Sequence, residues 1–366
     1  MKKQGTLPKS RILEMMPEFI SARSKDEVNN ASLDLAITDE VWRVDNVFLP
    51  RPGESIESIL ADTNKWRHPM DQPMWRGQTY IAKVAGSIEL PTSLYGYANP
   101  KSSLGRTDTH IRLMADGVAR YDCIPRGWKG QLWMLIQPLS FHIVVSAGER
   151  LNQVRFFTND TRFDEAELEV SMRRDNLLWN AKEKSIIPYG DIRISDKDGS
   201  IILLIDLVSD VVGFRAIRTE TPLVLADLKE KAADPREFFE IIERPRCGSL
   251  TLERMEFYIL STLEAIRIPP TLSGEMVSMD DRAGEFRSHY AGYFDACYGW
   301  GEHGEGTGNQ GTLEVRPWEK LRVRKEQAIA KMRLERMTEP ADPYDPTGNY
   351  GNQVGPTLAK FWKKWQ

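Results

Sequence analysis

The stretch Asn99-Pro100-Lys101-Ser102-Ser103-Leu104-Gly105-Arg106 places a lysine, two hydroxyls, a glycine and an arginine within six residues. Hydroxyls and backbone N–H groups bind phosphate oxygens directly, while Lys101 supplies a point charge and Arg106 a bidentate fork. Pro100 disfavours helix for the residue before it, so we expect the run to begin as a turn or at a strand end. The alternative is a surface loop that ends in a basic residue, because Lys, Ser and Gly are ordinary loop residues.

The length of 366 residues predicts two or three domains. A net charge of −4, with acids and bases mixed throughout, argues against a broad basic field for nucleic acid. The three cysteines, Cys123, Cys247 and Cys297, form no disulfide framework, and we see no signal peptide. The longest apolar run, residues 201–205, is too short to span a bilayer. We therefore expect a cytoplasmic protein with neither a nucleic acid nor a membrane as its partner.

Short strands with close turns dominate the first half of the chain. We expect strands at residues 31–37, 41–44, 77–88 with a break at Gly86, 111–114, 131–136, 141–145 and 151–157. A short helix over residues 8–16, ended by Pro17, precedes them. This pattern indicates a β-barrel or a β-sandwich.

A polar, acidic segment at residues 159–174 interrupts the strands, and we place a domain boundary near residue 165. Beyond it we expect strands at residues 186–194, 200–207 and 256–260 and a short helix at residues 235–243. Residues 320–337 fit either a helix or a final strand pair, and the prolines and glycines that follow predict an extended tail rather than a packed element. The expected domains are residues 1–165, residues 166–338 and a tail over residues 339–366.

Four features recur in the same order in the two halves, which indicates a duplicated β domain. A Ser and an Arg four residues apart are followed by a strand, then by an aromatic residue with Asp, then by Gly-Trp. The first-half and second-half members are Ser102 and Arg106 with Ser278 and Arg282, Tyr121-Asp122 with Phe294-Asp295, and Gly127-Trp128 with Gly299-Trp300. The halves differ in charge, because residues 131–145 contain no acid whereas the corresponding strand at residues 311–315 carries Glu314.

Residues 100–106 resemble the phosphate motif of the dCTP deaminase and trimeric dUTPase superfamily. Residues 289–295 (HYAGYFD), followed by Thr312-Leu313-Glu314, resemble the base-binding hairpin of the dCTP deaminases with its catalytic glutamate. Pro343-Tyr344 and residues 350–357 (YGNQVGPT) resemble the C-terminal segment that closes over the nucleotide, and residues 31–35 (ASLDL) resemble an early strand. The resemblance spans the whole chain and is greatest for the long, internally duplicated bacterial deaminases.

The resemblance implies a mainly β fold of two tandem dUTPase-like β-barrel domains with short helices and an extended C-terminal tail. It implies hydrolytic deamination of dCTP to dUTP and ammonia without a catalytic metal, supplying dUTP toward thymidylate. The implied catalytic residues are Glu314, Ser102 and Arg106. The implied substrate contacts are Lys101, Ser103, Ala291, Asp295, Tyr344 and Gln353. Because the first half has neither the glutamate nor the tail, the implied sites number half the barrels, each pairing the Ser-Arg motif with Glu314.

Each of these residues also has a plain structural interpretation. Glu314 fits the solvent face of an alternating strand, with Leu313 and Val315 facing the core. Ser102 fits a turn hydroxyl bonded to its own backbone, and Arg106 a surface ion pair. Asp295 fits a turn at a strand end, and Tyr344 and Gln353 fit a disordered tail.

Two further motifs resemble the signatures of other functions, but each lacks a part that the function requires. His303-Gly304-Glu305 spells the H-x-E of zinc nucleobase deaminases, but no cysteine follows Cys297 to complete that metal site. Residues 306–311 spell G-x-G-x-x-G, but a predicted strand, not a helix, comes next.

We expect Mg²⁺ to arrive with the triphosphate as a partner of the substrate, with no catalytic cofactor. The short relatives are trimers with sites between subunits, so we expect a homo-oligomer, most simply a trimer. A dUTPase, a bifunctional enzyme of the same fold and a non-catalytic nucleotide-binding regulator stay open as alternatives. The preference between dCTP and dCMP, feedback by dTTP and the role of Ser278 and Arg282 also stay open.

Overall fold

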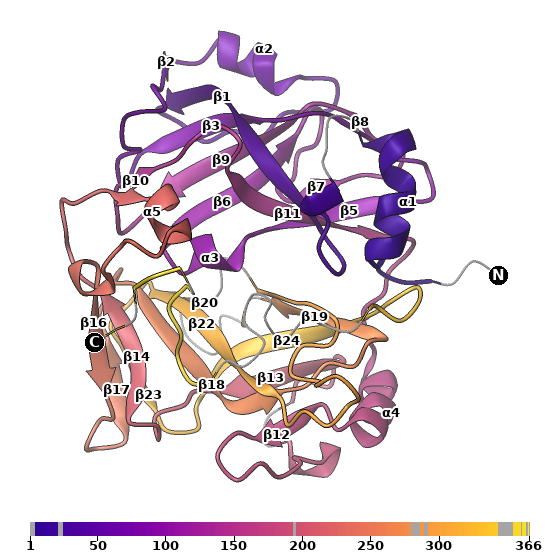
Figure 1. The fold of residues 1–366 in the computed structure, drawn as a ribbon, viewed down its shortest axis with the longest axis vertical. Helices are drawn as coiled ribbons and strands as arrows, with labels where there is room; N and C mark the ends of the chain where they lie inside the picture. The colour runs from indigo at the N-terminus through magenta and orange to yellow at the C-terminus, as the bar shows by residue number, and fades with distance from the viewer. Residues whose placement is uncertain are drawn as a thin grey trace. The chain divides into compact units, whose positions relative to one another are not determined.

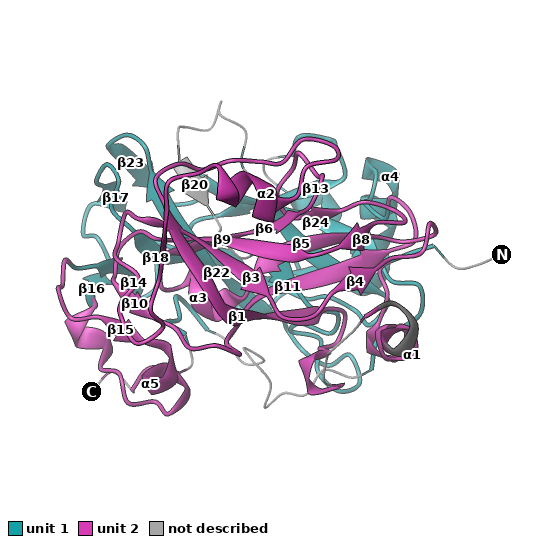
Figure 2. Ribbon diagram, turned by 90° about the horizontal axis from the view of Figure 1, so that it is seen from above, with its two compact units in different colours: residues 1–5, 161–217, 239–360 teal, residues 6–160, 218–238, 361–366 magenta. Residues whose placement is uncertain are grey.

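The computed structural model describes residues 4–20, 25–192, 195–277, 279, 286–288, 292–342, 354–359, 361–363 and 365. The chain divides into two compact units, which Figure 2 shows in two colours. Unit 1 comprises residues 1–5, 161–217 and 239–360, and unit 2 comprises residues 6–160, 218–238 and 361–366. Each unit therefore joins segments that are distant in the sequence.

Unit 2 is built on an eight-stranded sheet in the order β6-β9-β3-β1-β11-β5-β7, with β2 beside β1 (Figure 1). β1 (Leu33–Val44) pairs with β11 through its first residues and with β3 through its later ones, with a bulge between Leu35 and Ala36. A bulge bends a strand and increases its twist, so one strand serves both parts of a curved, barrel-like sheet. The separately predicted strands at residues 31–37 and 41–44 are this single element. The other strands of unit 2 are β2 (Lys65–Arg67), β3 (Thr79–Val84), β4 (Ile88–Glu89), β5 (Tyr95–Pro100), β6 (Thr109–Ala115), β7 (Cys123–Ile124), β8 (Lys129–Gly130), β9 (Leu132–Pro138), β10 (Ile143–Val144), β11 (Arg150–Phe157) and β15 (Leu223–Val224).

The helical elements of unit 2 are short. They are α1 (Lys9–Phe19), η1 (Lys25–Glu27), α2 (Ile56–Ala61), α3 (Ser102–Gly105), α5 (Leu225–Lys229) and η3 (Pro235–Glu237). The prediction that Pro17 ends the first helix is wrong by two residues. A proline ring removes only one amide donor, and the amide of Ile20 still donates to the carbonyl of Met16 at 3.2 Å.

Unit 1 contains a six-stranded sheet in the order β16-β14-β18-β22-β20 with β12 beside β18, and a four-stranded sheet in the order β13-β24-β19-β21. Its strands are β12 (Leu178–Asn180), β13 (Ser200–Leu204), β14 (Val211–Ala216), β16 (Phe239–Glu243), β17 (Ser249–Leu252), β18 (Tyr258–Ile266), β19 (Leu272–Val277), β20 (Phe286–Ser288), β21 (Tyr293–Phe294), β22 (Asn309–Pro317), β23 (Leu321–Arg324) and β24 (Ala328–Arg336). Its helical elements are α4 (Glu165–Asp175) and η2 (Tyr189–Asp191). Leu313 and Val315 of β22 lie in its main hydrophobic core with Leu203 and Met332.

The acidic segment near residue 165 is a helix whose start the sequence specifies. The Asp164 side chain accepts from the amide of Glu167, and the Glu167 side chain accepts from the amide of Asp164, which completes a capping box. Leu168 and Met172 of this helix are buried in the unit 1 core. The polar composition that interrupts the strand pattern therefore belongs to the exposed face of an amphipathic helix.

The two units share one strand order, which confirms the internal repeat. The series β1-β11-β5-β7 of unit 2 corresponds to β13-β24-β19-β21 of unit 1, and each series passes from an early strand of its repeat to a late one, β11 or β24. The series β3-β9-β6 corresponds in the same way to β18-β22-β20. The predicted fold class, mainly β with two related barrel-like domains, is confirmed.

The strand register identifies equivalent residues that the sequence comparison above missed. Arg43 pairs with Tyr80 in unit 2, and Arg215 pairs with Tyr258 in unit 1. Each tyrosine is almost fully buried, and each phenol oxygen accepts a hydrogen bond of 2.8 Å from the backbone amide five residues earlier. Burial raises the pKa of both phenols above the ordinary value. Such a repeated local bond is a stronger mark of duplication than the Ser-x₃-Arg spacing.

Residues 218–238 belong to unit 2 although they follow the second-half strand β14 in sequence. β15 pairs in parallel with β10, with Ile143 opposite Leu223, and α5 follows directly (Figure 2). The Lys229 ammonium forms an ion pair of 2.6 Å with the Glu149 carboxylate. The second-half sequence therefore contributes a strand and a helix to the first-half fold.

Four predicted segments differ from the structure or are decided by it. Residues 235–243 are not a helix but a 3₁₀ turn followed by β16, because this segment pairs with β14 and tertiary pairing overrides helix propensity. In the described part of the predicted strand at residues 186–194, Ile186 forms an isolated bridge with Trp179 and residues 189–191 form the turn η2. Residues 320–337 form two strands, not a helix, but the strands do not pair with each other: β23 pairs with β17, and β24 pairs with β13 and β19. Within the predicted tail, Leu358, Ala359 and Trp362 are buried, so the prediction of an unpacked tail is wrong there.

Candidate active site

The basic stretch forms a single helical turn at the end of a strand. β5 ends at Pro100, and α3 follows with Lys101 at its N-cap. The amides of Leu104 and Gly105 both donate to the carbonyl of Lys101, at 2.9 and 3.1 Å. The strand-end start that Pro100 predicts is confirmed, and the partly exposed Ser102 and Ser103 stand in the first turn.

Lys101 is held by a buried carboxylate of β1. Its ammonium is ion-paired with Asp34, whose side chain is 3% exposed, and the other carboxylate oxygen of Asp34 accepts from the side-chain Nδ2 of Asn29 at 2.8 Å. The predicted early strand thereby positions the predicted phosphate ligand. A bound phosphate would share the Lys101 charge with Asp34.

Arg106 is 5% exposed, so the alternative of a surface loop with a surface ion pair is wrong. The amide of Arg106 donates to the carbonyl of Ser102 at 3.1 Å, which closes the turn over the serine. Asp108 then adopts φ 55°, the left-handed conformation that aspartate tolerates better than most residues, and it accepts from the Ser140 hydroxyl at 2.5 Å. Arg106 is therefore a buried cation at the end of the basic turn.

Glu314 lies in the middle of β22, opposite Ile259 of β18. Leu313 and Val315 face the core as the alternation predicts, but Glu314 is only 1% exposed. The interpretation of Glu314 as a solvent-facing residue is therefore wrong. A buried carboxylate is costly unless other groups compensate its charge or its chemistry is used.

The same register shows what unit 2 has in place of Glu314. Tyr80 pairs with Ile136 and Ile81 with Leu135, just as Tyr258 pairs with Val315 and Ile259 with Glu314. The equivalent of Glu314 is thus Leu135, which is 1% exposed in a small apolar cluster. The acid is present in one repeat only, as the absence of acids from residues 131–145 predicts.

The other predicted substrate contacts come from the hairpin and the tail. Asp295 follows β21 (Tyr293–Phe294) and accepts from the amide of Tyr298 at 3.2 Å through its carbonyl. Ala291, Tyr344 and Gln353 lie outside the described residues, as do Ser278 and Arg282. The structure thus brings Lys101, Ser102, Ser103 and Arg106 together on one turn of unit 2, whereas Asp295 and Glu314 belong to unit 1.

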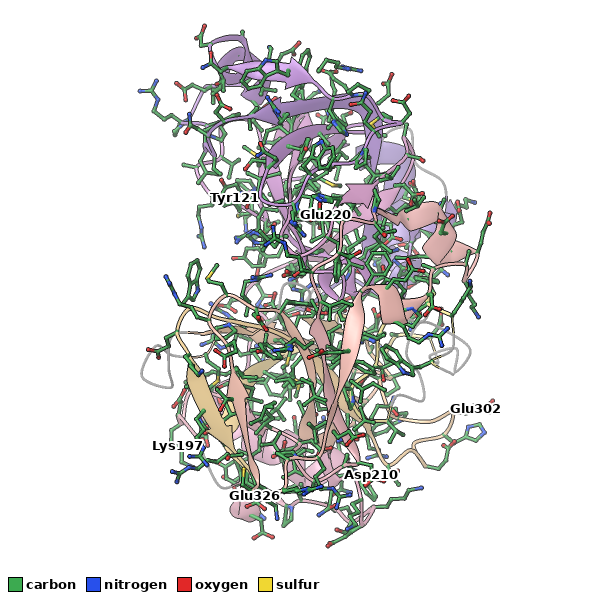
Figure 3. All side chains as sticks on the ribbon, turned by 90° about the vertical axis from the view of Figure 1, so that its left-hand side faces the viewer. Tyr121, Lys197, Asp210, Glu220, Glu302 and Glu326 are labelled. Carbon is green, nitrogen blue, oxygen red and sulfur yellow. The ribbon has the colours of Figure 1, made fainter. Side chains whose placement is uncertain are left out.

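Of the glycine-rich segment at residues 306–311, residues 306–308 lie in the loop before β22 and residues 309–311 begin that strand. Arg267 stacks on Trp300 with 3.8 Å between the guanidinium carbon and the ring centroid, and its guanidinium donates to the carbonyls of Asp175 and Gly304. The Glu305 carboxylate accepts from the amides of Glu302 and His303, and backbone hydrogen bonds lower its pKa. Glu302 lies on the projecting part of this loop (Figure 3). The H-x-E motif here is thus a turn whose acid caps backbone amides.

The described residues include no group of three or more His, Cys, Asp or Glu side chains placed to hold a metal ion. In that same part of the chain, none of the helices has the length and apolarity required to cross a membrane.

Comparison with known proteins agrees with the fold and the motifs. Residues 3–160 match the profile of the 2'-deoxycytidine 5'-triphosphate deaminase (DCD) N-terminal domain, and residues 165–361 match the profile of its C-terminal domain. The crystal structure of 2'-deoxycytidine 5'-triphosphate deaminase from Agrobacterium tumefaciens is 30% identical, with a TM-score of 0.81 over 94% of this chain and 100% of that chain. A mutant dUTPase of Staphylococcus bacteriophage 80alpha is 12% identical, with a TM-score of 0.25 over 48% of this chain and 93% of that chain. Among curated protein sequences, none matches this chain significantly.

The chain is therefore a mainly β enzyme built from two related domains. Both domain profiles and the full-length structural match define it further. It belongs to the dCTP deaminase family.

Proposed function

We propose that this chain converts dCTP and water to dUTP and ammonia, with Glu314 as the group that carries the protons. The observation that carries the role of Glu314 is its burial on β22 at a position where the other repeat has Leu135. A repeat that only needed a filled core would accept an apolar residue at both positions. One repeat instead keeps a carboxylate at 1% exposure, which supports a chemical role.

The proposed reaction needs one carboxylate that acts in sequence. Glu314 takes a proton from water as the water oxygen adds to C4 of cytosine, and it gives that proton to N3. The hydroxyl proton of the tetrahedral intermediate then passes through Glu314 to the amino group. The C4–N bond breaks, ammonia leaves with the bonding electron pair, and the C4 carbonyl forms. Ser102 orients the water, and Asp295 and Ala291 contact the sugar and base.

The phosphate end of the substrate would bind the basic turn. Lys101 contributes charge, and Ser103 and Arg106 contribute hydrogen-bond donors from the same turn. Tyr344 and Gln353 contact the nucleotide from the C-terminal segment. Mg²⁺ accompanies the triphosphate as part of the substrate, and the reaction at C4 uses no catalytic metal.

The test is release of ammonia from dCTP by the wild type and by Glu314→Gln, with the nucleotide products separated by chromatography. Glutamine keeps the size of the side chain but cannot accept and return a proton, so we expect deamination to fall by roughly 10²–10⁴-fold. Glu335→Gln is the matched control, because Glu335 is also a buried acid of unit 1, at 3% exposure on β24. The control should keep its activity.

The alternatives give different products in the same assay. Release of pyrophosphate from dUTP without ammonia from dCTP would establish a dUTPase, and both products would establish a bifunctional enzyme. Tight binding of dCTP with neither product would establish a regulator. Deamination that survives excess EDTA supports the metal-free reaction, and full activity of Glu314→Gln would refute the assigned role.

We also propose that the chain forms a homo-oligomer, most simply a trimer, in the cytoplasm. The three cysteines are free thiols, which supports a reducing compartment. Light scattering should give three times the mass of the chain. A monomeric mass would refute the oligomer.

A further inference from the structure

Gln310 lies on β22, four residues before Glu314 and on the same face of the strand. It is 5% exposed and hydrogen-bonds to three separate segments of unit 1. Its side-chain nitrogen donates to the Asp206 carboxylate at 3.1 Å and to the Thr262 carbonyl at 2.6 Å. Its side-chain oxygen accepts from the amide of Gly355 at 2.8 Å.

The chemistry of these partners sets the orientation of the Gln310 amide. A carboxylate and a carbonyl can only accept hydrogen bonds, so they require the NH₂ group on their side. The amide of Gly355 can only donate, so it requires the oxygen. The opposite orientation would face donor to donor and acceptor to acceptor.

Asp206 is itself held in place. Its carboxylate accepts from the amides of Val208 and Ser209 at 2.8 and 3.2 Å and from the Ser209 hydroxyl at 2.6 Å. At 1% exposure it cannot turn toward water. Asp206 is therefore a fixed partner for Gln310, which in turn contacts Gly355.

Gly355 is the point where the C-terminal segment is joined to β22. It adopts φ 68°, and Leu358 and Ala359 beyond it are buried. Gln353, which the family resemblance places on the nucleotide, precedes Gly355 by two residues in sequence.

The backbone of Gln310 also connects to the predicted base-binding hairpin. The Tyr298 hydroxyl donates to the Gln310 carbonyl at 3.0 Å, and the amide of Tyr298 donates to the carbonyl of Asp295 at 3.2 Å. One residue of the Glu314 strand thus contacts the C-terminal segment directly and is connected to Asp295 of the hairpin through Tyr298.

We propose that Gln310 is a positioning residue that holds the C-terminal segment at Gly355 and thereby sets where the preceding residues meet the nucleotide. Gln310 does not touch the reacting atoms. Its role in the reaction rests on the proposed function, whereas the attachment at Gly355 does not.

The first experiment measures hydrogen exchange at the amides of residues 354–359 without nucleotide. Gln310→Leu removes the acceptor for Gly355 and both side-chain donors while keeping the volume nearly unchanged. We expect exchange in this segment to rise roughly tenfold, which corresponds to ~1.4 kcal/mol. Gln327→Leu is the matched control, because the Gln327 side chain also accepts from a backbone amide, that of Arg324 at 3.0 Å, but at another loop of unit 1. The control should leave residues 354–359 unchanged.

A second variant keeps the test decisive if Gln310→Leu does not fold. Gln310→Glu retains an acceptor toward Gly355 but loses both donors and faces Asp206 with a like charge. It should also raise exchange at residues 354–359. Unchanged exchange in a folded variant would overturn the proposal.

The second experiment is the kinetics of dCTP deamination. A loosened C-terminal segment should raise KM for dCTP about tenfold in Gln310→Leu, and the pH profile should keep its shape because Gln310 does not touch the reacting atoms. Faster exchange together with an unchanged KM would overturn the role in the reaction. A wild type that does not deaminate dCTP would refute the proposed function and that role, but the exchange result would still decide the attachment.

Discussion

We expect Tyr80 and Tyr258, the equivalent buried tyrosines of the two repeats, to raise the free energy of unfolding by similar amounts. Tyr258→Phe removes only the phenol oxygen, which accepts from the amide of Glu253 at 2.8 Å. Tyr258 is 2% exposed, so water has little access to replace the lost acceptor. An amide left without its partner costs ~1–3 kcal/mol. Tyr80→Phe should lose a similar amount, because Tyr80 is 0% exposed and accepts from the amide of Trp75 at 2.8 Å.

The assay is urea unfolding followed by circular dichroism and by tryptophan fluorescence, since two units need not unfold in one transition. With a urea dependence of ~2–3 kcal/mol/M, the midpoint should fall by about 0.3–1.5 M at unchanged slope. Hydrogen exchange at the amide of Glu253 should rise in Tyr258→Phe alone. The control is Tyr97→Phe at a tyrosine that is 36% exposed, and it should shift the midpoint by much less. If Tyr258→Phe behaves like Tyr97→Phe, the repeated phenol–amide bond does not stabilise the fold and the reasoning fails.

Three further predictions address the charge of Asp198, the repeat that has Leu135 in place of Glu314, and the contact of Arg267 with Trp300. Burial opposes ionisation of Asp198, but hydrogen bonds from Lys331, Ser200 and Arg333 outweigh it and hold its pKa below the ordinary value. Its stabilising contribution is therefore present above about pH 4 and is lost as pH falls toward its folded pKa. Asp198→Asn should be less stable than the wild type at pH 7, and the difference in unfolding free energy should narrow as pH falls below about 4; a constant difference would contradict the assignment. Leu135→Glu should lower the unfolding free energy by about 3 kcal/mol or more and add no deaminase activity, because Leu135 is 1% exposed among apolar side chains. The control Leu135→Met should lower the unfolding free energy by less than ~1.5 kcal/mol. A gain of activity in Leu135→Glu would show that this repeat lacked only the acid. Arg267→Met should lose the Trp300 stack and two hydrogen bonds to carbonyls, which should lower the unfolding free energy by roughly 2–3 kcal/mol. It should also change Trp300 fluorescence and speed hydrogen exchange over residues 299–308, and Arg267→Lys should lie between the wild type and Arg267→Met. Equal effects of the two substitutions would exclude the stacking role.

Local sequence determined many of the elements directly. Alternating β-branched and aromatic residues predicted the strands of both halves, because a strand with one buried face must alternate. Asp164 and Glu167 determined the start of α4 through their own side chains. The prolines predicted the strand end at Pro100 but not the helix end at Pro17, since a missing amide forbids one hydrogen bond, not a whole turn.

The repeat was visible in sequence only faintly. Short spacings such as that of Ser102 and Arg106 recur by chance, whereas the pairing of Arg43 with Tyr80 and of Arg215 with Tyr258 is a property of the register. Register depends on two strands at once, so no single stretch of sequence carries it.

For the candidate site too, the sequence determined some features and only the tertiary structure decided the others. The sequence by itself determined which side chains are available: a basic turn with Lys101 and Arg106, and an acid at Glu314 in one repeat only. Only the tertiary structure decided that Arg106 and Glu314 are buried, that Asp34 holds Lys101, and that Gln310 joins Asp206 to Gly355. Burial and such hydrogen bonds arise between residues far apart in the chain, and they exist only once the strands that carry those residues have paired.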